Sequence, residues 1–121
     1  MGVAAVSGSA SGIGAAVRRR READGFRVVV VGLGDAAVTA DLSHAEGRAA
    51  AVEGVRAAGG GALDRLVLCA GLGPHTEDAP RIVSVNYFGA VELLDGLLPC
   101  LAGRPGAAAV VVASNSAQLG P

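Results

Sequence analysis

The sequence predicts an α/β fold, a doubly wound parallel sheet of about five strands with helices on both faces. Short apolar runs alternate with longer helix-like segments along the whole chain, which is the pattern of βαβ units. Apolar residues make up 51% of the 121 residues and aromatic residues only 2%. The core must therefore consist of Val, Ala and Leu, which suit strands covered on both faces.

The first half of the chain shows this alternation clearly. We expect a strand at 3–6, a helix from Ile13 to Ala23, a strand at 27–31 and a short strand at 37–40. Gly25 stands where a left-handed C-terminal cap would end the first helix. Ser43 and Glu46 have capping-box spacing, so a second helix should begin there and run to the glycines 59–61.

The second half continues the same order. We expect a strand at 65–69, a loop at 70–80, a helix from Ile82 to Leu98 and a strand at 107–114. Pro80 suits the first turn of that helix, and Pro99 should close it. Because helices join consecutive strands, the strands should pair in parallel through right-handed crossovers.

Charge and composition exclude several classes of partner. A net charge of -1 gives no electrostatic basis for binding nucleic acid or an anionic membrane. No basic leader precedes the first strand, and no apolar run approaches the roughly 20 residues that span a bilayer, so we expect a cytoplasmic protein. Cys69 and Cys100 are more consistent with two thiols than with a disulfide. His44 and His75 lack metal-ligand spacing, and we assign no metal.

The stretch VSGSASGIG, residues 6–14, follows the first apolar run directly. A helix that begins at such a turn offers unpaired backbone N–H groups and a positive dipole end, which together hold phosphate without a lysine. Gly8 would permit the tight turn, Gly12 the approach of a diphosphate and Gly14 the close packing of helix on strand. The turn is a poor match to a P-loop because no G-K-[ST] follows.

The turn S-G-x-x-x-G-I-G resembles the cofactor turn of the short-chain dehydrogenase/reductase family. Asp41-Leu42, Cys69-Ala70-Gly71, Asn86 and Ser114 match further motifs of that family in order. The run at 66–99 resembles especially its 3α-hydroxysteroid dehydrogenase/carbonyl reductase branch. The resemblance covers the whole chain and implies a Rossmann-like domain over 1–121 that is incomplete at its C-terminus.

The resemblance implies that the cofactor is NAD or NADP. It assigns cofactor contacts to Gly8, Ser11, Gly12, Ile13, Gly14, Asp41, Leu42, Ala70 and Gly71. Asp41 would accept a hydrogen bond from the adenine amino group, although it could instead simply precede the helix cap at Ser43. Ala70 and Gly71 would line the adenosine ribose.

The resemblance also implies two catalytic roles. Asn86 would support a water-bridged proton relay, and we expect its amide to be buried and partnered; an amide satisfied locally is the alternative. Ser114 would orient and polarise the substrate carbonyl, with Ser116 as the alternative if the strand register differs by two. The substrate implied is a hydroxysteroid or another hydrophobic carbonyl compound.

The cofactor preference depends on the end of the second strand. Gly32 stands where members of the family that prefer NAD carry an acidic residue, and Asp35 is the remaining candidate for the ribose if the loop folds back. No Arg follows the strand to pair with a 2′-phosphate, so the sequence favours NAD over NADP. The run Arg18–Arg21 is interpreted as a solvated helix face.

The family's chemistry needs a Tyr and a Lys four residues later, in a helix after the fifth strand. All ten basic residues here are Arg, and the single Tyr, Tyr87, belongs to an earlier helix. We therefore expect the N-terminal part of an oxidoreductase that acts on a secondary alcohol or ketone, inactive as this chain alone. The complete protein would be a homodimer or homotetramer. A non-catalytic dinucleotide-binding or interaction module, or an inactive truncated fragment, is the alternative.

Overall fold

The computed structural model describes residues 2–8, 12–34, 36–71 and 78–112. Along the chain the elements are β1 (Val3–Ser7), α1 (Gly12–Ala23), β2 (Arg27–Gly32), β3 (Val38–Thr39), α2 (Ala45–Ala58), β4 (Arg65–Leu68), α3 (Ala79–Val83), the π-helical turn η1 (Ser84–Phe88), α4 (Gly89–Leu101) and β5 (Ala108–Val111). These elements follow the predicted alternation of strands and helices.

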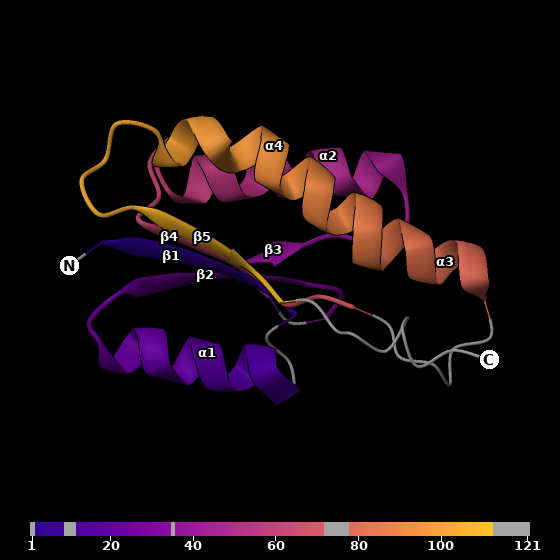
Figure 1. Ribbon diagram of the computed structural model, residues 1–121, viewed down its shortest axis with the longest axis horizontal. Helices are drawn as coiled ribbons and strands as arrows, with labels where there is room; N and C mark the ends of the chain where they lie inside the picture. The colour runs from indigo at the N-terminus through magenta and orange to yellow at the C-terminus, as the bar shows by residue number, and fades with distance from the viewer. Residues whose placement is uncertain (1, 9–11, 35, 72–77, 113–121) are drawn as a thin grey trace.

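The five strands form one parallel sheet in the order β3-β2-β1-β4-β5. Helix α1 covers one face, and α2, α3 and α4 lie on the other (Figure 1). The chain reverses its direction of winding between β1 and β4, which places a ligand crevice at the carboxyl ends of these two strands. The predicted doubly wound α/β fold is confirmed.

The core lies mainly between the sheet and the pair α2 and α4. Apolar side chains from both layers are almost completely buried there: Val29, Val31, Val55, Leu63, Leu66, Leu93 and Leu97. The continuous apolar runs of the central strands are explained by this arrangement, since helices on both sides leave no polar face.

The cap of α1 follows the prediction. Gly25 has φ 93°, and its N–H donates to the carbonyl oxygen of Glu22 at 3.0 Å. The N–H of Phe26 donates to the carbonyl oxygen of Arg21, also at 3.0 Å. These two bonds form a Schellman motif, in which a left-handed residue favours glycine.

The predicted capping box of α2 is wrong. The helix begins after His44, which makes no side-chain cap hydrogen bond. Ser43 instead donates its hydroxyl to Asp41 Oδ1 at 2.6 Å and its backbone N–H to the same oxygen at 2.9 Å. An aspartate two residues earlier thus competes for the serine, as Asp side chains do in local turns.

The predicted long helix extends further than expected at both ends. It begins at Ala79, after the N-cap Asp78, whose carboxylate accepts from Arg81 N–H at 3.1 Å. Pro80 lies in the first turn as predicted, but Pro99 lies inside α4, which ends at Leu101. The last turn is held from outside, because the N–H of Leu63 donates to the carbonyl oxygen of Cys100 at 2.9 Å.

Within the described residues, one helical stretch is long and apolar enough to cross a membrane by length and composition. It covers Ala79–Leu101, 23 residues with a mean hydropathy of 1.2, and 22% of its most apolar window is buried. The expectation from the sequence concerned uninterrupted apolar runs, and this helix carries Arg81, Glu92 and Asp95 among its apolar residues. Such evidence is weak by itself, since a helix that packs on a sheet passes the same test.

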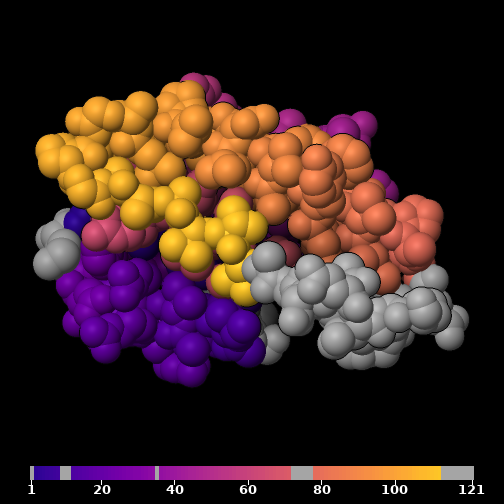
Figure 2. Space-filling model, in the orientation of Figure 1, coloured from indigo at the N-terminus to yellow at the C-terminus, as the bar shows by residue number. Residues whose placement is uncertain are grey.

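β5 forms one edge of the described sheet. It pairs with β4 on one side, and Val110, Val111 and Val112 are 54%, 44% and 38% exposed. Figure 2 shows this strand as a yellow band on the surface between α4 and α1. The edge therefore presents apolar side chains and backbone groups to solvent.

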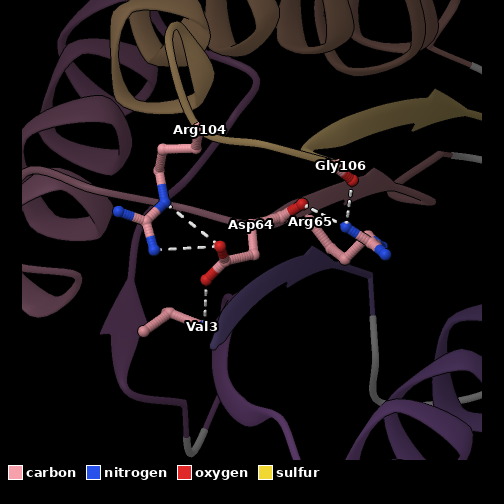
Figure 3. A network of polar contacts seen from close by, with 5 residues as sticks. All are labelled: Val3, Asp64, Arg65, Arg104 and Gly106. Carbon is pink, nitrogen blue, oxygen red and sulfur yellow. Dashed lines mark hydrogen bonds and ion pairs between the residues drawn. The ribbon is translucent and has the colours of Figure 1, made fainter. Parts of the chain in front are cut away.

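Asp64 connects several segments at the amino ends of the strands, opposite the ligand crevice (Figure 3). Its Oδ2 accepts from Val3 N–H at 2.8 Å, and its Oδ1 accepts from Arg104 Nη2 at 2.9 Å. The Val3 amide, followed by the hydrogen bond and charge of Arg104, lowers the pKa of Asp64. The carboxylate thus joins β1, β4 and the loop before β5.

Asp64→Asn is expected to destabilise the fold at pH 7 and to make no difference at low pH. Because the pKa of Asp64 is lower in the folded state, its contribution is complete above the unfolded-state pKa of about 3.9 and disappears as the pH falls through the folded-state value. Urea unfolding of both proteins from pH 7 to pH 2.5 measures this. Asp95→Asn, at an exposed position of α4, is the control; an equal loss in that variant would contradict the prediction.

Candidate functional site

A pocket of about 320 Å³ lies at the carboxyl ends of β1, β2, β3 and β4. Five of the predicted cofactor residues line it: Gly8, Asp41, Leu42, Ala70 and Gly71. They come from three separate turns that the sheet brings together at one edge. The place is the one where doubly wound sheets bind their ligands.

Gly8 makes the closest approach within this site. It has φ 73°, and a Cβ built on it would lie 2.7 Å from both Cα and N of Ala70. A side chain would therefore be strained by the backbone and would collide with the neighbouring turn. The turns after β1 and β4 can meet only because residue 8 is glycine.

Ser7 joins the same two turns through its side chain. It is buried, with 2% of its surface exposed, and its Oγ accepts from the backbone N–H groups of Cys69 and Ala70, each at 3.2 Å. Sequence reasoning missed this role. The signal was a hydroxyl residue at the end of the otherwise apolar strand VAAVS, where a buried polar group needs partners.

Asp41 lies between β3 and α2 with its carboxylate partly exposed. The hydroxyl and the backbone N–H of Ser43 lower its pKa, and the charges of His44 and Arg81 add to this effect. The acid is therefore ionised at neutral pH and able to accept a hydrogen bond from a ligand in the pocket. Its local partner is Ser43, which donates to it and does not cap α2. The alternative that Asp41 simply precedes a serine cap is therefore wrong.

Arg48 binds the backbone of Leu42, which lines the pocket. The guanidinium is buried; it donates from Nη1 to the carbonyl oxygen of Leu42 at 3.1 Å and from Nε to Glu92 Oε2 at 2.8 Å. Its Cζ also lies 5.6 Å from the centre of the Phe88 ring. No pattern in the sequence marks this residue, because Glu92 is 44 positions away. Arg48 connects the pocket wall to α4.

The glycine turn is described only in part. α1 begins at Gly12, which has φ 60°, and Gly14 is buried while Ile13 is 62% exposed. The helix thus starts one residue before the predicted position and directs its N-terminus to the carboxyl edge of the sheet (Figure 1). Ser11 lies outside the described residues.

Asn86 lies in the π-helical turn η1 beside the site. A Cβ on Gly71 would be 3.3 Å from Asn86 Oδ1, so the amide reaches the turn after β4. The expectation that Asn86 is buried was wrong, because Asn86 is exposed in this structure. Short π-helical turns occur frequently at functional sites. Ser114 and Ser116 lie outside the described residues, as does Asp35.

The run of arginines is largely solvated, as predicted. Arg18, Arg19 and Arg20 are exposed, and Arg18 also lines the pocket together with Gly32, Leu33 and Gly34. Arg21 is half-buried, with its Cζ 5.9 Å from the centre of the Phe26 ring. The run of four arginines therefore serves more than one surface.

The two cysteines are free thiols. Burial raises the pKa of the Cys69 thiol, which makes it a poor nucleophile. Among the residues that the structure describes, no group of three or more His, Cys, Asp or Glu side chains could hold a metal ion.

A family model described as short chain dehydrogenase matches residues 2–121. The chain belongs to this family. A 3-alpha-hydroxysteroid dehydrogenase/carbonyl reductase from Comamonas testosteroni is 51% identical over 94% of this chain and 44% of its own length. The predicted resemblance to the short-chain dehydrogenases, and to this branch in particular, is confirmed.

Solved structures of the family have the same fold. The 3-alpha-hydroxysteroid dehydrogenase from Pseudomonas sp. B-0831, complexed with NADH, superposes with a TM-score of 0.92 at 45% identity over 96% of this chain and 46% of its own. A metagenomic short-chain oxidoreductase in complex with NADP gives 0.78 at 29% identity over 93% and 62%. The chain spans about half the length of these short-chain dehydrogenases.

Proposed function

We propose that this chain is the dinucleotide-binding part of an oxidoreductase that interconverts a secondary alcohol and a ketone. The observation that carries the proposal is the pocket at the carboxyl edge of β1 and β4, lined by Gly8, Asp41, Ala70 and Gly71. The N-terminus of α1 faces the same edge and suits a diphosphate. The complexes of family members with NADH and with NADP support NAD or NADP as the ligand.

The described residues would contact different parts of the dinucleotide. Asp41 would accept a hydrogen bond from the adenine amino group, with Leu42 packed beside the base and Ala70 and Gly71 along the adenosine ribose. The dinucleotide supplies or accepts the hydride when bound. Ser114 would hold the carbonyl oxygen of the substrate, and Asn86 would support the proton relay. The Tyr and Lys of the reaction would come from outside the 121 residues.

The proposed substrate is a hydroxysteroid or another hydrophobic carbonyl compound. Its support is the likeness to proteins named as 3-alpha-hydroxysteroid dehydrogenases, because the described pocket residues would contact the dinucleotide and not the substrate. A cytoplasmic location without a membrane partner stays a prediction from the sequence.

An association role is the second candidate, and one surface favours it. Val83, Tyr87, Val91 and Leu98 are 50%, 58%, 38% and 53% exposed. They recur at intervals of four and seven along α3, η1 and α4, which places them on one side of a helix. This surface supports the proposal that the complete protein is a homodimer or homotetramer, and it would also serve a non-catalytic interaction module.

Titration of the isotope-labelled chain with NADH tests the main proposal. The amide resonances of Gly8, Gly12, Gly14, Ala70 and Gly71 are expected to shift, while those of Gly60 and Gly106, in turns at the opposite end of the strands, should stay in place. Uniform or absent shifts in a folded chain would sink the dinucleotide assignment. A protein extended through its coding sequence should then reduce a ketone with NADH or NADPH, whereas turnover by the 121-residue chain alone would contradict the assigned roles.

A further inference from the structure

The pocket lining includes the end of β2, where two of three consecutive residues are glycines, and a cation from another element. Gly32 is the last residue of β2 and pairs with Thr39; Leu33 and Gly34 follow it. All three line the pocket together with Arg18. The cation comes from α1, on the other face of the sheet from α2 and α3 (Figure 1).

The direction of Arg18 follows from its helix. Long side chains on a helix lean toward its N-terminus, and the N-terminus of α1 lies at the carboxyl edge of the sheet. The Arg18 side chain pairs with Glu22 through Nε and Oε2 at 3.5 Å, with 45% and 48% of the two side chains exposed. Exposed pairs of this kind hold a side chain weakly, so a bound phosphate can compete for the guanidinium.

The charges that line the described pocket favour an anion at this end. Its ionisable side chains are Arg18, Arg81 and Asp41. The carboxylate of Asp41 is tied to Ser43 and lies near Arg81, on the side of α3. Arg18 is therefore the ionisable group among the described lining residues that comes from the α1 side, in a pocket that Gly32 also lines.

On the basis of the proposed function, we infer that Arg18 selects a dinucleotide whose adenosine carries a 2′-phosphate. The 2′ position of the adenosine is read at the end of the second strand in this kind of fold: a carboxylate there binds the ribose hydroxyl, and an arginine accommodates the phosphate. Gly32 supplies no carboxylate to repel a phosphate dianion. A guanidinium binds phosphate through paired, charge-assisted hydrogen bonds.

This inference reverses the preference for NAD that the sequence favours. That preference rested on the absence of an Arg after the second strand, whereas Arg18 precedes the strand in the sequence. The fold brings it to the pocket that the end of β2 also lines, because α1 packs against β1 and β2. On this proposal, an arginine that precedes the strand in the sequence takes the place of one that follows it.

The test compares two small ligands that differ by one phosphate, 2′,5′-ADP and 5′-AMP, on the 121-residue chain by calorimetry. The chain is expected to bind 2′,5′-ADP about 10- to 100-fold more tightly, the range of a hydrogen-bonded charge pair. Arg18→Met should remove most of this advantage and leave the affinity for 5′-AMP within about twofold, since the phosphate is the group that Arg18 contacts. Arg19→Met is the matched control, because it removes the same charge from the neighbouring exposed position of α1.

A second variant tests the same idea in the opposite direction. A Cβ on Gly32 would lie 3.9 Å from the Cβ of Ala36, an ordinary contact, so the fold has space for a side chain there. Gly32→Asp is expected to lower the affinity for 2′,5′-ADP by about tenfold or more, because the carboxylate repels the 2′-phosphate. It should raise the affinity for 5′-AMP, because the carboxylate can bind the ribose hydroxyls.

The outcomes separate this inference from the proposed function. A folded chain that binds neither ligand overturns both. Equal affinity for the two ligands, or an unchanged affinity of Arg18→Met for 2′,5′-ADP, overturns the role of Arg18 and leaves the dinucleotide site standing. Equal losses in Arg18→Met and Arg19→Met would show a general charge effect and would also overturn it.

Discussion

Gly8→Ala is expected to lower the free energy of unfolding by about 2–5 kcal/mol and to abolish dinucleotide binding. Two effects add at this position. The backbone has φ 73°, which an L side chain adopts only with strain, and the new methyl group would lie 2.7 Å from Ala70 Cα. Because the methyl group would collide with the backbone Cα and N of Ala70, no side-chain rotation relieves the collision. The turns after β1 and β4 must therefore separate. Urea unfolding and NADH titration measure the two losses.

Gly60→Ala separates strain from collision. Gly60 also has a positive φ of 65°, but a Cβ there meets nothing within 4 Å. We expect a loss of only about 1–2 kcal/mol from the backbone conformation alone, with dinucleotide binding unchanged. Losses of the same size in both variants would show that the contact with Ala70 has no energetic importance.

Gly47→Ala is expected to destabilise the fold by about 2–4 kcal/mol, although alanine is the better helix former. Gly47 lies in the first turn of α2, and its added methyl group would fall well inside van der Waals contact with the carbonyl oxygen of Asp41. Either α2 or the turn at Asp41 must move. The variant should therefore also bind 5′-AMP more weakly, which calorimetry measures together with urea unfolding.

Gly89→Ala provides the matched control for this change. Gly89 is a buried helical glycine of α4, and its nearest outside contact would be Leu42 Cβ at 3.6 Å, an ordinary distance. Alanine there should be neutral or stabilising by up to about 1 kcal/mol. If Gly47→Ala behaved in the same way, close packing of α2 on Asp41 would not limit stability.

The fold was predictable because its signals are local. Each central strand is a short apolar run, and the glycine turn and the cap at Gly25 follow from the residues next to them. The errors arose where two local preferences competed or a distant contact decided. Ser43 bonded to Asp41 instead of capping α2, and α4 continued past Pro99 because Leu63 holds the carbonyl oxygen of Cys100.

The sequence predicted residues that line the candidate site, but not the residues that hold the lining in place. The resemblance to the family assigned Gly8, Asp41 and Ala70, which the fold gathers around one pocket. Ser7 and Arg48 were missed because their partners are distant in the sequence: the Ala70 amide for Ser7 and Glu92 for Arg48. Pairwise contacts of this kind become visible only when the chain is folded.

The position of β1 has a consequence for how the domain opens. This strand lies in the middle of the described sheet between β2 and β4, whereas β5 has a single neighbour among the described strands and an exposed surface. Amide protons of β5 are thus expected to exchange with heavy water through small, frequent openings, and those of β1 only when most of the sheet separates. The turn at Gly8 is attached to the slowest-opening strand, so the pocket wall persists while the periphery of the sheet frays.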